Sequence, residues 1–194
     1  MVLASEFTAM NKHALDGMKV AILVADGFEQ AEMTEPRRAL QAVGAQTVLV
    51  SPASGRVRGW KHLEPADAFE VDMPLAQAAA HEFDALLVPG GVISSDSLRM
   101  NAQAIAFVRS FLKACKPVAA ICHGPGMLIE ADAVGGRTMT SWPALRTDLK
   151  NAGAKWVDRE VAVHGNLITS RKPGDLPAFT REMIKVFAAA HVEA

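Results

Sequence analysis

The sequence has little of several features that mark common classes of protein. Only two cysteines, Cys115 and Cys122, occur in 194 residues. Two cysteines so close together do not make the disulfide framework of a secreted domain, so we expect the reducing cytoplasm as the setting. The 20 basic and 21 acidic residues leave a net charge of −1, which gives no sign of binding to nucleic acid or to an anionic membrane surface.

Long apolar runs are also missing, since none approaches the roughly 20 residues of a membrane-spanning helix. The start of the chain has no basic region followed by the apolar segment of a secretory signal. No G-x-G-x-x-G follows the first apolar run, there is no Walker A motif, and the histidines show no metal-ligand spacing. We therefore expect no nucleotide, no other cofactor and no metal.

Short apolar runs alternate along the chain with helical patterns, which indicates an α/β protein. The runs lie at 20–25, 47–50, 83–88 and 118–121. Helical patterns lie at 29–43 with an interruption near Pro36, at 74–80 as a short helix, at 101–113 with Asn101 as its N-cap, and after Asp175. The runs are apolar throughout, as is typical of strands covered on both faces. We predict a mostly parallel central sheet in a flavodoxin-like three-layer sandwich.

The domain boundaries follow from the same pattern. No linker interrupts residues 18–194, which we expect to form a single domain, with a hairpin excursion at 55–71. Residues 1–17 lack strong periodicity, and we expect a poorly ordered N-terminal extension there.

Cys122 is the residue with the clearest chemical setting. It follows the run Val118–Ile121 directly, and Gly124-Pro125-Gly126 then opens a helical stretch. A nucleophile on such a strand-to-helix turn stands exposed above the sheet, and the helix N-terminus favours its thiolate. Most free cysteines are merely buried small hydrophobes. The adjacent His123 and the glycines favour a functional role for Cys122, whereas we expect Cys115 to be inert packing.

Three loops should meet at one edge of the predicted sheet, because sites in such sheets lie at the carboxyl ends of the strands. These loops are Asp26–Glu29, Pro89–Gly91 and Cys122–Gly124. Backbone N–H groups of Gly90, Gly91 and the 123–124 turn (His123 and Gly124) could form an oxyanion hole. A plain turn would use the paired glycines equally well.

Three segments also carry a resemblance to a known family. A-D-G-F-E-Q-A-E (Ala25–Glu32), L-V-P-G-G (Leu87–Gly91) and A-I-C-H-G-P (Ala120–Pro125) occur in this order along the chain. Together they resemble the DJ-1/PfpI superfamily, and most closely its PfpI-like branch of intracellular proteases and stress proteins. The likeness extends from about Met18 to Phe187. It implies a flavodoxin-like fold, a cysteine enzyme and a homodimer or higher homo-oligomer.

The resemblance also implies roles for acidic residues. It places a glutamate of the second motif beside the cysteine sulfur, and we expect this to be Glu29, although a carboxylate there could simply favour the start of a helix. Glu32 is then expected to be structural or at a subunit interface. Relatives assign the histidine after the cysteine to catalysis, with an acid from a neighbouring subunit. The matching segment here offers only Asp96, for which a loop or helix-cap role is the alternative.

Three functions remain open from the sequence. The first is an enzyme acting on reactive carbonyls such as methylglyoxal, which the resemblance implies as glyoxalase III-like or deglycase-like activity through a Cys122 hemithioacetal. The second is an intracellular cysteine peptidase or amidase that uses Cys122, His123 and an acid from a second subunit. The third is a redox sensor or chaperone that acts through Cys122 oxidation.

Overall fold

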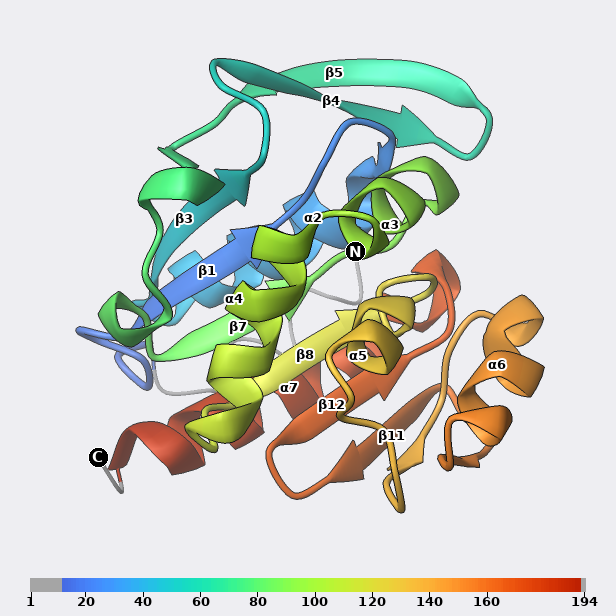
Figure 1. The fold of residues 1–194 in the computed structure, drawn as a ribbon. Helices are drawn as coiled ribbons and strands as arrows, with labels where there is room; N and C mark the ends of the chain where they lie inside the picture. Colours follow the sequence, from blue (N-terminus) through green and yellow to red (C-terminus); the bar gives the residue numbers. More distant parts are fainter. Residues whose placement is uncertain (1–11, 193–194) are drawn as a thin grey trace.

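A seven-stranded sheet forms the centre of the computed structural model, which describes residues 12–192 (Figure 1). Its strand order is β11-β12-β8-β7-β1-β3-β6, and all neighbours are parallel except β11 and β12. The strands are β1 (Lys19–Leu23), β3 (Gln46–Ser51), β6 (Met73–Pro74), β7 (Ala85–Val88), β8 (Val118–Ile121), β11 (Val161–His164) and β12 (Leu167–Ser170).

The central strands are buried on both faces, as their unbroken apolar sequences predict. Every residue of β7, β8 and β12 is buried. The four strand predictions are confirmed to within two residues at each end. A hairpin also pairs β11 with β12.

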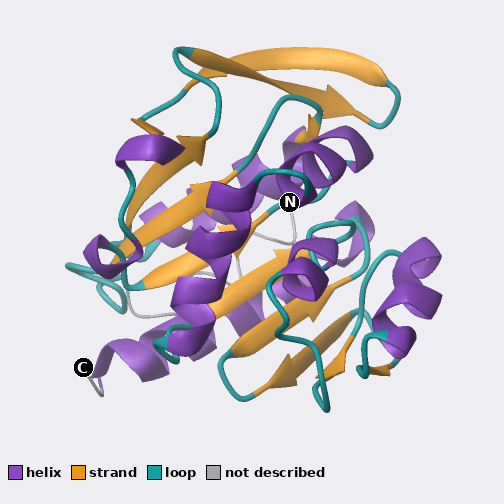
Figure 2. Ribbon diagram, viewed as in Figure 1, coloured by secondary structure: helices purple, strands orange, loops and turns teal. Residues whose placement is uncertain are grey.

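Helices cover both faces of the sheet and complete three layers (Figure 2). One face carries α4 (Ala102–Lys113) and α5 (Gly126–Glu130), and the other carries α2 (Gln30–Ala42) and α7 (Leu176–Val192). Each face has its own apolar cluster, because alternate residues of one strand point to opposite sides: Ala21 and Leu23 of β1 belong to the first cluster, and Val20 and Ile22 to the second. The predicted three-layer sandwich is confirmed.

Two helix ends follow from local sequence. The Asn101 side chain accepts hydrogen bonds from the N–H groups of Gln103 and Ala104, both at 3.0 Å, and so caps α4 as predicted. Helix α2 ends before Gly44, which has a φ of +99°. The predicted interruption at Pro36 is wrong. Helix α2 continues through this residue, whose side chain is buried with the rest of the helix's apolar face.

The hairpin excursion is confirmed, and it adds a small second sheet. Strands β4 (Arg56–Lys61) and β5 (Glu64–Glu70) pair antiparallel, as Figure 1 shows. Strand β4 also pairs with β2 (Phe28–Glu29). A further short pair joins β9 (Thr138–Met139) to β10 (Lys155–Trp156), and α6 (Arg146–Asn151) lies between them in sequence.

Other segments differ from the expectation. The predicted short helix at 74–80 is replaced by two 3₁₀ turns, Leu75–Gln77 and Ala80–Glu82. Helix α3 (Val92–Arg99) was not predicted, because its run of serines has low helix propensity. Cys115 is exposed at a turn with a φ of +54°, so the expectation that it packs in the interior is wrong.

The segment expected to be a poorly ordered extension is described only in part. Residues 1–11 lie outside the described residues. Residues 12–17 form a turn in which Leu15 is fully buried and donates its N–H to the Val43 carbonyl at 2.9 Å. Within residues 12–192, no helix is both long enough and apolar enough to cross a membrane.

Candidate active site

Cys122 directly follows β8 in a backbone conformation that non-glycine residues rarely adopt. Its φ is +61°, and such a left-handed residue persists only where its surroundings fix it. Its N–H donates to the Ser170 carbonyl at 3.0 Å, and its carbonyl accepts from the Trp142 N–H at 2.8 Å. The residue is only 7% exposed, so the expected exposed thiol is wrong.

The predicted convergence of the three loops is confirmed. The Glu29 N–H donates to the Gly90 carbonyl at 3.1 Å. A Cβ on Gly90 would lie 2.6 Å from the Cys122 Cβ, and one on Gly91 would lie 2.4 Å from the Gly27 carbonyl oxygen. Only glycine allows the 89–91 loop to pass between its two neighbours.

A cavity of about 540 Å³ opens at this meeting point. Its lining combines the three loops with the 62–63 turn of the β4–β5 hairpin and with segments from the last third of the chain. The lining residues are Glu29, Glu32, His62, Leu63, Gly91, Val92, Cys122, His123, Trp142, Lys172, Pro173 and Gly174.

The carboxyl group that accompanies Cys122 belongs to Glu32, not to Glu29. Glu32 is fully buried, its Oε2 accepts from the Gly90 N–H at 2.8 Å, and its carboxyl interacts with the Cys122 thiol. Glu29 instead accepts a hydrogen bond from the His62 N–H at 2.9 Å. Glu29 lies in β2 and faces the hairpin, whereas Glu32 lies three residues further on, on the buried face of α2.

Burial determines the charge of Glu32. Loss of water around the carboxyl raises its pKa to about 8. The hydrogen bond from Gly90 lowers this pKa, and the nearby charge of Glu29 raises it. Glu32 is therefore mostly protonated at neutral pH. A protonated carboxyl can donate a hydrogen bond to sulfur, which an ionised one cannot.

Burial also raises the pKa of the Cys122 thiol, and a negative Glu32 would raise it further. The backbone N–H groups of Gly91 and His123 act in the opposite direction by hydrogen bonding to the sulfur. The expectation of an acidic thiol at a helix N-terminus is wrong, because burial outweighs these N–H groups. Helix α5 also begins only at Gly126 and contains just five residues. The thiol needs a base when it reacts.

His123 lies where such a base is required. Its Nδ1 is 3.3 Å from the Cys122 Sγ, although the side chains of adjacent residues commonly diverge. Burial lowers the pKa of the imidazole, so the ring is neutral at pH 7 and can accept a proton. The ring also stacks on Trp142, with centroids 5.8 Å apart and planes 27° apart.

Two of the expected oxyanion donors are occupied. The Gly90 N–H is bound to Glu32, and the Gly124 N–H donates to the Ile121 carbonyl at 2.8 Å within the turn. The N–H groups of Gly91 and His123 remain directed at the sulfur. Asp96 is exposed on α3 and does not line the cavity, so within one chain it does not join the other candidates.

Several lining residues were missed from the sequence. His62, Leu63, Trp142 and Lys172 belong to segments with no recognisable motif. Along the described residues, no group of three His, Cys, Asp or Glu side chains could hold a metal ion.

The geometry defines a class of protein, an α/β sandwich with a cysteine–histidine–carboxyl site at the carboxyl ends of its strands. A sequence profile of the DJ-1/PfpI family matches residues 18–186. The chain belongs to the DJ-1/PfpI family.

Individual relatives agree with this assignment. The chain is 43% identical to "Deglycase TK1284" of Thermococcus kodakarensis over 169 residues, covering 87% of this chain and 99% of the relative. It is 41% identical to "Putative cysteine protease YraA" of Bacillus subtilis over 168 residues, covering 87% and 97%.

Among solved structures, the chain resembles a two-domain protein from Anabaena variabilis that contains DJ-1/ThiJ/PfpI-like and ferritin-like domains. The TM-score is 0.82 at 37% identity, over 87% of this chain and 47% of the other.

Proposed function

We propose that this protein is a cysteine enzyme that converts small α-oxoaldehydes such as methylglyoxal to hydroxy acids, with deglycase-like action on their adducts. The observation that supports this most is the contact between the Cys122 Sγ and the neutral His123 Nδ1, beside a protonated Glu32 in one small cavity. The "Deglycase" name of a relative 43% identical over nearly its whole length supports the same substrate class.

The first step forms a hemithioacetal. The Cys122 sulfur attacks the aldehyde carbon while His123 takes the thiol proton, and the carbonyl electron pair moves to oxygen. The N–H groups of Gly91 and His123 are the available donors near that oxygen, and the imidazolium returns the proton to it. The thiol's raised pKa makes this transfer to His123 necessary, because little free thiolate exists at neutral pH.

The second step moves hydrogen between two carbons. His123 removes the proton of the former aldehyde carbon, and the C–H electrons form an enediol while Glu32 protonates the adjacent ketone oxygen. Glu32 then recovers a proton from the hydroxyl next to sulfur, and His123 protonates the second carbon, which leaves a thioester. Water attacks this thioester, releasing the hydroxy acid and restoring the thiol. One carbon is oxidised and its neighbour reduced, and the net change is addition of one water.

Turnover of methylglyoxal to lactate, followed by chromatography, tests the proposal. We expect wild type to be active, Cys122→Ala to be inactive with an unchanged circular dichroism spectrum, and His123→Asn to be strongly impaired. Full activity of folded Cys122→Ala would overturn the proposal.

A peptidase or amidase is the second candidate, supported by the same Cys122–His123 contact and by the name "Putative cysteine protease YraA". In this alternative, His123 would protonate the leaving amine, oriented by Asp96 of a second subunit. Cleavage of a fluorogenic peptide by the wild type, lost in Cys122→Ser, would favour it over the carbonyl reaction.

A further inference from the structure

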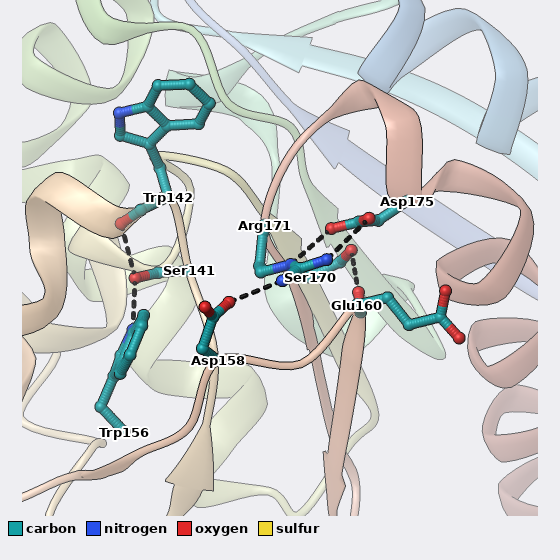
Figure 3. A network of polar contacts seen from close by, with 8 residues as sticks. All are labelled: Ser141, Trp142, Trp156, Asp158, Glu160, Ser170, Arg171 and Asp175. Carbon is teal, nitrogen blue, oxygen red and sulfur yellow. Dashed lines mark hydrogen bonds and ion pairs between the residues drawn. The ribbon is translucent and has the colours of Figure 1, made fainter.

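Trp142 lies in a short loop that is held in place by hydrogen bonds from Trp156 and Ser141. Trp156 Nε1 donates to the Ser141 Oγ at 3.0 Å, and this hydroxyl donates to the Trp142 carbonyl at 2.9 Å. Figure 3 shows this chain of contacts, with the Trp142 ring extending away from it. Pro143 follows and restricts Trp142 to extended backbone, which matches its φ of −51° and ψ of 133°.

Trp142 then contacts both members of the cysteine–histidine pair, with two different groups. Its backbone N–H donates to the carbonyl of Cys122 at 2.8 Å, which helps to fix the left-handed conformation of that residue. Its indole ring stacks on the imidazole of His123. The stack covers one face of the imidazole and leaves the ring edge, with Nδ1, directed at the sulfur.

We propose that Trp142 is a positioning residue that holds the His123 ring in the orientation in which Nδ1 faces the Cys122 sulfur. An imidazole attached next to the cysteine has two free side-chain torsions, and without the stack it can turn toward solvent. Aromatic pairs of this kind contribute about 0.5–1.5 kcal/mol beyond the area that they bury, and this is enough to favour one orientation roughly 2–13-fold.

Among the described residues, no further side chain hydrogen-bonds to the His123 ring besides the Cys122 thiol. The titratable groups that share its cavity are the Cys122 thiol, the buried Glu32 and, further round the lining, Glu29, His62 and Lys172. Of these groups, the Cys122 thiol is the one that lies within hydrogen-bond distance of the imidazole, at Nδ1. The stack therefore decides the orientation of the ring within one chain.

Two substitutions separate positioning from a simple role as a cavity wall. Trp142→Leu removes the stack but keeps the backbone N–H and an apolar side chain, whereas Trp142→Phe keeps an aromatic ring. For methylglyoxal turnover, which depends on the function proposed above, we expect kcat to fall about tenfold in the leucine variant and to stay within about twofold in the phenylalanine variant. Because the exposed imidazole regains a more ordinary pKa, the acid limb of kcat should move to higher pH in the leucine variant. A raised KM with unchanged kcat would overturn the proposal, because it would indicate a substrate wall.

A second measurement does not need turnover. The ¹⁵N spectrum of the imidazole rings, with the His123 signals assigned by their loss in His123→Asn, reports the tautomer and the environment of both nitrogens. We expect one tautomer in wild type and in Trp142→Phe, and averaged shifts in Trp142→Leu. If this pattern appears while methylglyoxal is not consumed, positioning is supported and the proposed reaction is wrong. Unchanged His123 signals in Trp142→Leu, or equal disturbance in Trp142→Phe, would overturn the positioning role.

Discussion

At the scale of single residues, the site depends on which carboxyl is buried. Glu29 and Glu32 are separated by less than one helical turn, yet only Glu32 reaches the cysteine. Removal from water keeps the Glu32 proton in place to about pH 8. A proton held there can hydrogen-bond to the sulfur or move to substrate, and both uses end when the carboxyl ionises.

The pH dependence of activity should therefore have two limbs. Below the lowered pKa of His123 the imidazole is protonated and cannot accept the thiol proton, so activity falls at acid pH. Near pH 8 Glu32 loses its proton, so activity falls again. We expect Glu32→Gln to lower kcat about 10²–10⁴-fold and to remove the fall near pH 8.

Two control variants test whether the loss of the alkaline limb is specific to Glu32. Glu29→Gln removes the hydrogen bond to the 62–63 turn, and Glu35→Gln changes an exposed residue of the same helix. Both should retain the alkaline limb, which initial rates of methylglyoxal consumption across pH would show. Loss of that limb in Glu29→Gln but not in Glu32→Gln would restore Glu29 to the role expected from the sequence.

The two cysteines should differ in reactivity in the order opposite to the one that the sequence suggests. Cys115 is exposed, whereas Cys122 is buried and its pKa is raised. With a bulky disulfide reagent at pH 7, we expect Cys115 to react first and Cys122 at least about tenfold more slowly, because only the accessible thiolate attacks. Peptide mass spectrometry of timed samples, with Cys115→Ser as the control, would measure this. Faster labelling of Cys122 would show that its thiolate is activated despite burial.

At the scale of elements, the segment after β12 forms a closed loop beside the cavity. Arg171 binds Asp175 through two hydrogen bonds, at 2.8 and 3.1 Å, and Asp158 through a third, at 2.6 Å, as Figure 3 shows. Between the joined ends, Lys172, Pro173 and Gly174 line the cavity. The loop, which directly precedes α7, therefore forms one wall of the cavity.

The two acidic partners of Arg171 should contribute unequally. The side chain of Asp175 is 8% exposed and that of Asp158 is 65% exposed. We expect Asp175→Ala to lower the free energy of unfolding by about 1–3 kcal/mol, since it breaks a partly buried two-point contact. Asp158→Ala should cost less than about 1 kcal/mol, as exposed ion pairs do. Urea unfolding of both variants would test this, and equal losses would contradict it.

At the scale of the whole molecule, the surface beside the site suggests assembly. Val92 and Ile93 are exposed at the start of α3, and Asp96 lies exposed on the same helix. We expect a homodimer or higher homo-oligomer that covers this helix, because apolar side chains adjoining a polar rim are typical of interfaces.

Light scattering at micromolar concentration would measure the assembly, and Ile93→Glu should weaken it because it places a charge in the interface. If Asp96 acts on the partner's site, Asp96→Asn should lower activity only in the assembled form. A monomeric wild type with full activity would rule out a role for Asp96 across an interface.

The sequence by itself determined the sheet, the order of its strands in the chain and the meeting of three loops at one edge. Unbroken apolar runs can be satisfied only by strands buried on both faces, and parallel strands bring their carboxyl ends together. Cys122, His123 and the 89–91 loop could therefore be placed at one site from residue types alone.

Only the tertiary structure decided how that site works. Whether Glu29 or Glu32 meets the sulfur depends on the residue at which α2 begins and on which of its faces is buried. Whether Cys122 is acidic depends on how much water reaches it, and the surrounding loops exclude most of it. Trp142 and Lys172 join the site from distant parts of the chain that carry no motif. These features arise from packing between helices, strands and loops. Local sequence patterns predict the helices and strands, but they do not predict how deeply each side chain is buried.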